Sequence, residues 1–297
     1  MKFLNPVYKR ELKQTARMYR TPVLIFCYNA FLALFGLFSF YITFGKGNEY
    51  YNKLHYEDIL TIYGIITGIE FILFLLLVPA LTAGSISGER EKQTLDILLT
   101  TKLTPFQIIL GKLLSSISIM ILLAVSSLPI IALCFSIGGI TLLDLAKFLL
   151  FLIVTAIYLG SISIFFSTYC KRTTAATVCS YFAMLVLVFL SLLLVIGVGI
   201  LSLLNKEDIS YHLSFLLTSC GKAIGNWIYI LLLNPIISFF SMLKDQIGYG
   251  TQEGYLFLMS NGMSPFCYEH WFFISLILQL IVSLLFLWLA SRKITPC

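Results

Sequence analysis

Long apolar runs separated by short polar segments dominate the hydrophobic pattern of the chain. Each run is long enough for an α-helix to cross a bilayer, which takes about 20 residues, whereas the strands of a membrane barrel alternate apolar and polar residues over shorter segments. The pattern therefore predicts an all-α polytopic membrane protein. The predicted transmembrane helices, six in number, are 22–44, 59–84, 105–135, 144–167, 173–203 and 271–290.

Composition supports this fold class. The 297 residues are 59% hydrophobic and 11% charged, far below the roughly 25% charge of soluble domains. We find no internal repeat and no linker, so residues 1–297 are predicted to form a single membrane domain. The basic N-terminal residues precede a full-length span without a cleavage pattern, which argues against a cleaved signal peptide.

An amphipathic helix is predicted over 3–20. Asn5 suits the N-cap and Pro6 the first helical position. Apolar residues recur at spacings of three and four, and basic residues fill the remaining surface, as expected for a helix in the headgroup plane of anionic lipid. Thr21-Pro22 repeats the cap-and-proline signal before the first span. The apolar stripe comprises Leu4, Val7, Tyr8, Leu12, Ala16 and Tyr19, and the cations are Lys9, Arg10, Lys13, Arg17 and Arg20.

The segment Ser85–Lys112 interrupts two apolar runs with charge. Its cluster Glu89, Arg90, Glu91, Lys92 cannot lie in hydrocarbon. We expect a short helix, 88–100, with Glu89 and Glu91 in its first turn, where acidic groups complement the helix dipole, and with Leu95, Leu98 and Leu99 on one face. Thr104 and Gln107 form the pattern of a capping box that starts the third span. The pattern leaves two interpretations open: a docking element for a partner, or a plain surface helix in a loop.

The distribution of basic residues predicts the topology. With six spans and a cytoplasmic N-terminus, fourteen Lys and Arg lie inside and six outside, in agreement with the positive-inside rule. Both termini and the charged segment are then cytoplasmic. Residues 204–270 form an irregular outer segment, in which the apolar stretch 223–243 is expected to be re-entrant rather than a full span. Cys220 and Cys267 would both face outside, and their spacing does not establish whether they pair.

Two residues of the second span stand out. Glu70 lies near the middle of the apolar run, where an ionisable group usually faces a cavity or a partner. It is a candidate for the translocation path, unless the span boundaries place it at the outer interface. Pro79 is predicted to kink the helix shortly before the charged segment.

Several kinds of site are not indicated by the sequence. Gly111-Lys112 is not followed by Ser or Thr and belongs to no phosphate-binding loop. The histidines, His55, His212 and His270, are far apart, so no catalytic residues, no metal site and no cofactor bound by this chain are predicted. The net charge of +6 comes from residues beside the membrane and does not indicate nucleic-acid binding.

The stretch GEREKQTLDILLTTKLTPFQIILGKLL resembles the signature of the ABC-2 permease family, the membrane subunits of ATP-driven exporters. That signature reads E-R-E-x-G-T-L-[ED]-x-L-L, followed by a Thr/Ser and Pro region and then G-K-L. Gln93 stands where glycine is usual. The run from NPVYKREL to YRTP and the pair Asn234-Pro235 also resemble the family. The matching residues are Glu89, Arg90, Glu91, Thr94, Leu95, Asp96, Leu98, Leu99, Pro105, Gly111 and Lys112.

The resemblance implies that 88–100 is a coupling helix that inserts into a cytosolic ABC ATPase subunit, which carries the ATP and Mg. It also implies six spans per permease and a permease dimer in a bacterial plasma membrane, formed with an identical copy or a different chain. The expected function is the permease subunit of an exporter for an antimicrobial peptide, a lipid or another amphipathic compound. The residues expected to dock the ATPase are Glu89, Arg90, Glu91, Thr94, Leu95 and Leu98.

Other functions remain open from the sequence. A channel or secondary transporter independent of ATP would need a polar pathway or broken-helix repeats, of which Glu70 is the one hint. A membrane-embedded enzyme would need clustered catalytic side chains. A non-transporting immunity or sensor subunit could use the same docking helix.

Overall fold

The computed structural model describes residues 6–45, 56–95, 104–137, 140–204, 228–247 and 270–294. The elements formed by these residues are helices, which confirms the all-α fold class. They are α1 (Pro6–Arg17), α2 (Arg20–Gly45), α3 (Tyr56–Thr82), α4 (Gly84–Glu91), α6 (Pro105–Ile137), α7 (Leu142–Tyr169), α8 (Thr173–Leu204), the 3-10 helix η1 (Ile228–Leu233), α10 (Pro235–Ile247) and α13 (Trp271–Ile294).

Within the described residues, five helices are long and apolar enough to cross a membrane. They correspond to the predicted spans 22–44, 59–84, 105–135, 144–167 and 271–290. The predicted span 173–203 is helical throughout as α8, and the continuous part of it whose side chains the structure describes, Thr173–Phe189, is an apolar helix. Five spans are thus supported by length and composition, and the sixth stays a prediction.

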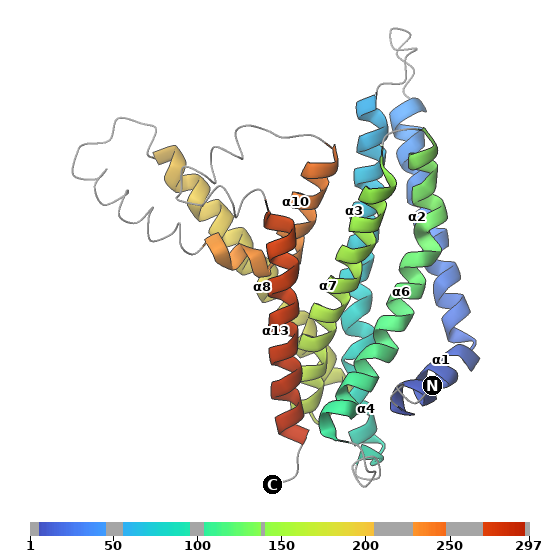
Figure 1. The fold of residues 1–297 in the computed structure, drawn as a ribbon, viewed down its shortest axis with the longest axis vertical. Coiled ribbons are helices and arrows are strands. Elements are labelled where there is room, and N and C mark those ends of the chain that lie inside the picture. The colour runs from blue at the N-terminus through green and yellow to red at the C-terminus, as the bar shows by residue number, and fades with distance from the viewer. Residues whose placement is uncertain are drawn as a thin grey trace, which may run out of the picture. The chain divides into compact units, whose positions relative to one another are not determined.

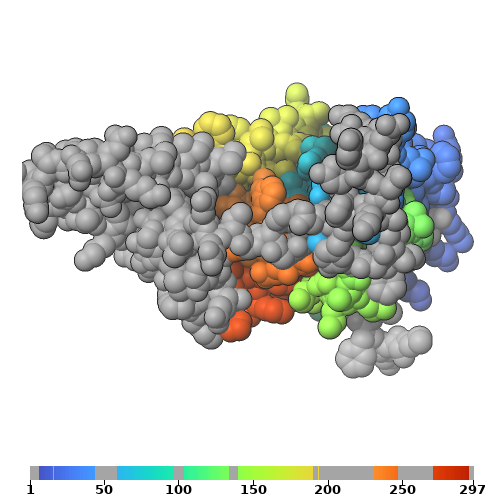
Figure 2. Space-filling model, turned by 90° about the horizontal axis from the view of Figure 1, so that it is seen from above, coloured from blue at the N-terminus to red at the C-terminus, as the bar shows by residue number. Residues whose placement is uncertain are grey.

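The chain divides into two compact units, one formed by Met1–Ser180 with Val282–Cys297 and the other by Tyr181–Ile281. In the first unit, α2, α3, α6 and α7 run side by side, and α1 crosses beside one end of α6 (Figure 1). The same end carries α4 and the last turns of α13 (Figure 1). Figure 2 looks at the opposite end, with α2 in blue and the beginning of α7 in light green.

The break between α1 and α2 lies earlier than the sequence predicts. Helix α2 begins at Arg20, so Thr21 lies inside its first turn rather than at its N-cap. The Thr21 hydroxyl donates to the backbone oxygen of Thr15, at 2.9 Å. It therefore satisfies a carbonyl at the end of α1, where the last carbonyls of a helix lack internal partners.

Helices α3, α6 and α7 pack closely because α7 has no side chain at one crossing point. A Cβ atom built on Gly160 would lie 3.3 Å from Leu113 Cδ1 of α6 and 3.6 Å from Thr82 Cγ2 of α3. The contact with Leu113 is tighter than ordinary van der Waals packing, so a larger residue here would push Leu113 aside.

In the second unit, Asn234-Pro235 separates η1 from α10. The side chain of Asn234 accepts a hydrogen bond from the amide of Ile236, at 2.8 Å, and so caps the start of α10. Helix α10 has 13 residues and is about 20 Å long, less than the roughly 30 Å of hydrocarbon in a bilayer. The described part of the stretch 223–243 is thus broken. Whether it is re-entrant stays a prediction, and most of 204–270, with Cys220 and Cys267, lies outside the described residues.

A buried polar cluster ties α13 to this break. Ser275 donates to the carbonyl of Leu232, at 3.0 Å, and shares a hydrogen bond with Ser238 of α10. Gln279 donates to both hydroxyl groups at 3.2 Å. Because these side chains are almost fully buried, their mutual hydrogen bonds replace the water that they lose on burial.

Candidate functional site

The charged segment follows α3 almost without interruption. Helix α3 ends at Thr82, and α4 runs from Gly84 to Glu91, so the apolar helical stretch from Ile59 to Glu91 has 33 residues. Pro79 lies inside α3, and its carbonyl accepts from the amide of Ala83, at 2.9 Å. The helix break therefore lies at Ala83, four residues after the proline, and the kink at Pro79 stays a prediction.

The predicted start of the helix at residue 88 is wrong, because α4 begins four residues earlier, at Gly84. Glu89 and Glu91 lie in the last turn of α4 rather than in a first turn. The reason is a contact from α7: Ser167 Oγ accepts from the backbone amides of Ile86 at 3.0 Å and Ser87 at 2.9 Å. It thereby satisfies donors in the first turn of α4, as an N-cap would. Residues 96–103 lie outside the described residues.

Helix α4 ends in a Schellman motif. The amide of Thr94 donates to the carbonyl of Glu89, at 2.9 Å, and the amide of Gln93 donates to that of Arg90, at 3.1 Å. These are the two bonds of the motif, whose residue after the C-cap is left-handed and usually glycine. Gln93 occupies that position with φ of 57°. The glycine that is usual at this point of the signature is thus explained by backbone conformation, and the helix stops here instead of continuing through Gln93.

Replacing Gln93 by glycine should raise the free energy of unfolding by about 1 kcal/mol, because a left-handed backbone costs an ordinary residue more than glycine. Thermal unfolding of the purified protein in detergent measures the change. Lys92→Gly is the matched control: Lys92 has φ of −80°, so glycine there should lower stability. A shift of the same sign in both variants would contradict the assignment.

Glu89 joins three segments of the chain through Lys112. The ammonium group of Lys112 lies 3.2 Å from Glu89 Oε1 and 2.8 Å from Glu11 Oε1 of α1. The Lys112 side chain is 4% exposed, and the two carboxylates are 25–29% exposed. Glu89 also accepts from the Thr94 hydroxyl. A carboxylate in the last turn of a helix opposes the helix dipole, and the lysine compensates for it.

Arg90 binds the end of α7. Its guanidinium donates to the carbonyl oxygens of Thr168 and Cys170, both at 3.1 Å. The last carbonyls of a helix lack partners inside the helix and carry partial negative charge. Arg90 therefore acts as a cationic C-cap for α7, supplied from a distant part of the chain.

Glu91 binds the beginning of α8. Its carboxylate accepts from the backbone amide of Thr173 at 2.8 Å and from the Thr173 hydroxyl at 3.1 Å. The first amides of a helix are donors without internal acceptors, and negative charge is favourable there. Glu91 thus acts as an N-cap for α8, although it is exposed.

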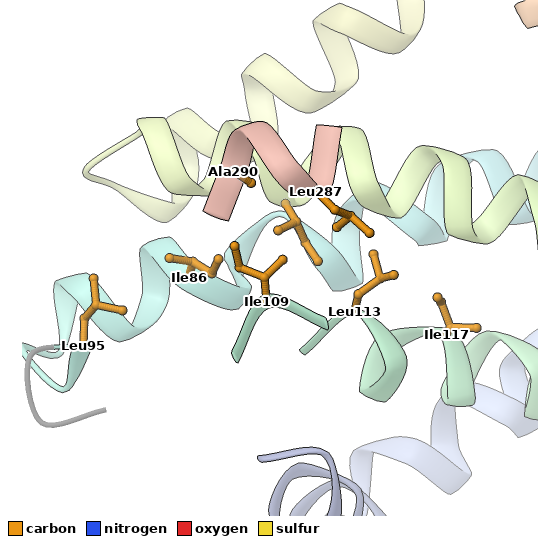
Figure 3. Packing of buried hydrophobic residues seen from close by; sticks show 8 residues of the cluster. Ile86, Leu95, Ile109, Leu113, Ile117, Leu287 and Ala290 are labelled. Carbon is orange, nitrogen blue, oxygen red and sulfur yellow. The ribbon is translucent and has the colours of Figure 1, made fainter. Parts of the chain in front are cut away.

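Leu95 belongs to an apolar cluster inside the first unit. It is 9% exposed and lies at the edge of a cluster that includes Ile86 of α4, Ile109 of α6 and Leu287 of α13, with Ile86 as its nearest labelled neighbour (Figure 3). The remaining members of the cluster are Leu113, Ile117, Ile164 and Ala290. This burial does not favour the expectation that Leu95 faces an ATPase, and Leu98 lies outside the described residues.

The start of the third span is as the sequence predicts. Gln107 Oε1 accepts from the amide of Thr104 at 3.1 Å, and Thr104 Oγ1 accepts from the amide of Gln107 at 3.4 Å. These reciprocal bonds are those of a capping box. The capping box fixes the start of α6, the helix by which the chain returns from the charged segment to the helical bundle.

Taken together, the charged segment connects α4 to α1, α6, α7 and α8 at one end of the first unit. A displacement of this segment would act on all four helices at once.

Glu70 does not belong to the charged segment. It is 0% exposed and bonds to Tyr28 of α2 and Ser127 of α6. Sequence reasoning did not identify Glu11, Ser167 or Thr173 as part of the site, since each contacts the segment across 80 to 101 residues of sequence.

A comparison with protein families decides the identity of the chain. Residues 41–292 match the model of the ABC-2 family transporter protein. The chain belongs to the ABC-2 transporter family. A comparison with the curated proteins gave no match. The chain is therefore an ABC-2 type permease domain, a kind of subunit that is typically non-catalytic, and the charged segment lies within the matched residues.

Proposed function

We propose that this ABC-2 permease domain is the membrane subunit of an exporter and couples transport to a separate cytosolic ABC ATPase through the charged segment. The observation that carries the proposal is the triplet Glu89, Arg90 and Glu91, whose side chains each bind a different helix. ATP-driven closure of two ATPase subunits would move this segment and, with it, the helices that line the path. The coupling requires that the ATPase bind two permease states with different affinities.

The triplet and the adjacent turn have different tasks in this proposal. Glu89, Arg90 and Glu91 transmit the movement, because their charged groups are already bound within the chain. Lys92 and Gln93 are exposed at the tip of the turn and meet the ATPase, together with the segment that contains Leu98. Thr94 and Leu95 hold the turn in shape through Glu89 and the apolar cluster.

Helix α1 is proposed to lie at the cytoplasmic headgroup level of a bacterial plasma membrane. It contacts α6 through Tyr8, whose hydroxyl lies 2.9 Å from Ser118 Oγ, and through Glu11. Its cations are exposed. A hollow of about 410 Å³ is lined by Arg10, Lys13, Gln14, Arg17 and Met18, and its charge suits anionic lipid headgroups.

We infer a substrate class and a second permease from what the resemblance to the family implies. Two permease copies, identical or different, would enclose the path. An antimicrobial peptide, a lipid or another amphipathic compound would suit the composition of residues 46–58, which include Tyr50, Tyr51 and Tyr56, and of the outer segment 204–270. Most of these residues lie outside those that the structure describes.

Replacing Lys92 by glutamate tests the docking face. The variant should copurify with its ATPase roughly tenfold less, because reversing one charge at an interface costs about 1.4 kcal/mol or more. Substrate-stimulated ATP turnover should fall in parallel. Copurification from membranes and ATP turnover in lipid nanodiscs measure the two effects.

Lys171→Glu is the control, since Lys171 is exposed on the neighbouring turn between α7 and α8 and the change in charge is the same. It should keep ATPase binding near the wild-type level. Full binding and full stimulation in the Lys92 variant, with an unchanged melting temperature, would refute the docking face.

A further inference from the structure

Glu70 is enclosed between three transmembrane helices. It belongs to α3, and its partners are Tyr28 of α2 and Ser127 of α6. Glu70 and Ser127 are 0% exposed and Tyr28 is 5% exposed. On the side facing α7, the adjacent residue Phe71 packs on Phe151, with ring centroids 5.3 Å apart. The Glu70 side chain is thus buried between the three helices and has no access to water in this conformation.

The contacts of α1 indicate the depth of this cluster. Ser118 of α6 touches α1 through Tyr8, and α1 is proposed to mark the headgroup level. Ser127 lies nine residues further along α6, which is about 14 Å at 1.5 Å per residue. Since the hydrocarbon layer is about 30 Å thick, Glu70 lies near its middle. The alternative position of Glu70 at the outer interface is not favoured.

The hydrogen bonds around Glu70 are those of a neutral acid. Tyr28 donates to Oε1 at 3.2 Å, and Ser127 Oγ lies 2.5 Å from the same oxygen. Ser127 Oγ also lies 2.9 Å from the carbonyl oxygen of Ala124. A serine hydroxyl has one hydrogen, so it cannot donate fully to both oxygens. A proton on Glu70 supplies the missing hydrogen, while Ser127 donates to Ala124.

The second oxygen of the Glu70 carboxyl group also indicates a neutral acid. Glu70 Oε2 is buried and has no hydrogen-bond partner among the residues that the structure describes. No described lysine or arginine forms an ion pair with Glu70 there. An ionised carboxylate in this position would hold a full charge in hydrocarbon without a counter-ion, and a buried carboxyl group avoids that cost by taking up a proton.

We propose that Glu70 is an intramembrane proton-binding site, and that in this conformation it is a neutral carboxylic acid that links α2, α3 and α6. The site does not depend on the ATPase or on the docking face. A neutral acid offers no counter-charge to a cationic substrate, so Glu70 can bind a cation only after it has lost its proton. That loss requires the three helices to separate enough to admit water.

Infrared spectroscopy of the purified protein in lipid nanodiscs at neutral pH tests the proposal. The difference spectrum of wild type minus Glu70→Gln should show the carbonyl stretching band of a protonated carboxylic acid. Glutamine is neutral and of the same size, so the variant should keep the melting temperature of the wild type. Carboxylate stretching bands in the difference spectrum, in place of the acid band, would overturn the proposal.

A second variant keeps the test decisive if Glu70→Gln does not fold. Ser127→Ala removes a hydrogen-bond partner of the acid and should shift its carbonyl band. Ser161→Ala is the control, since Ser161 is also fully buried but bonds to Tyr158 within its own helix, and it should leave the band in place. A wild-type spectrum without an acid band that responds to Ser127→Ala would also overturn the proposal.

Discussion

Replacing Lys112 by methionine should lower the free energy of unfolding by about 2–3 kcal/mol. Methionine keeps the apolar length of the side chain but leaves Glu11 and Glu89 without their shared cation. Removing one partner of a buried ion pair costs roughly 3–5 kcal/mol, and the lower value is expected because both carboxylates are 25–29% exposed and can regain water. Thermal unfolding in detergent measures the loss.

Two double-mutant cycles separate the ion pairs from the packing of the lysine stem. Combining Lys112→Met with Glu89→Gln should cost clearly less than the sum of the two single changes, and so should combining it with Glu11→Gln, since the groups share one network. Lys147→Met is the control: Lys147 pairs with Asp144 at 3.8 Å and its side chain is 43% exposed, so its loss should cost less than about 1 kcal/mol. Equal losses in the two methionine variants would refute the role of Lys112.

Replacing Arg90 by lysine should weaken the link between the charged segment and α7, although the charge is kept. The guanidinium donates to two carbonyl oxygens with two different nitrogens, and a lysine ammonium lacks this planar fork. Loss of a hydrogen bond to a charged donor costs about 1.5–3 kcal/mol. We expect a lower melting temperature and ATP turnover that no longer responds to substrate.

ATPase copurification and a control variant distinguish a role of Arg90 in coupling from a role in binding the ATPase. ATPase copurification should be nearly unchanged in Arg90→Lys, because Arg90 acts inside the chain, whereas it should fall in Lys92→Glu. Lys171→Arg, a change in the opposite direction at an exposed position, should leave all three readouts unaltered. Substrate-stimulated turnover at the wild-type level in Arg90→Lys would show that the contact with α7 is not needed for coupling.

Local signals in the sequence predicted much of the fold. Continuous apolar runs located the five supported spans, and the pair Thr104 and Gln107 located the start of α6 to the residue. Pro6 likewise is the first residue of α1. These features depend on residues within a few positions of one another, so the sequence pattern contains what is needed to predict them.

The site was harder to predict because its contacts are distant in sequence. The sequence indicated that Glu89, Arg90 and Glu91 matter, but not that each binds a different helix inside the chain. The start of α4 depends on Ser167, 80 residues away, so a helix beginning at 88 was the simpler prediction. Gln93 was expected to be helical, since only the backbone shows that its place in the signature requires a left-handed residue.

The ion pairs of Lys112 also have a consequence for the order of assembly during synthesis. Lys112 follows Glu11 by 101 residues and Glu89 by 23 residues. Chains emerge from the ribosome N-terminus first, so both carboxylates are made before the cation that joins them. Helix α1 and the end of α4 can therefore be joined only when the third span has been made, and this end of the first unit is completed later than its first two spans.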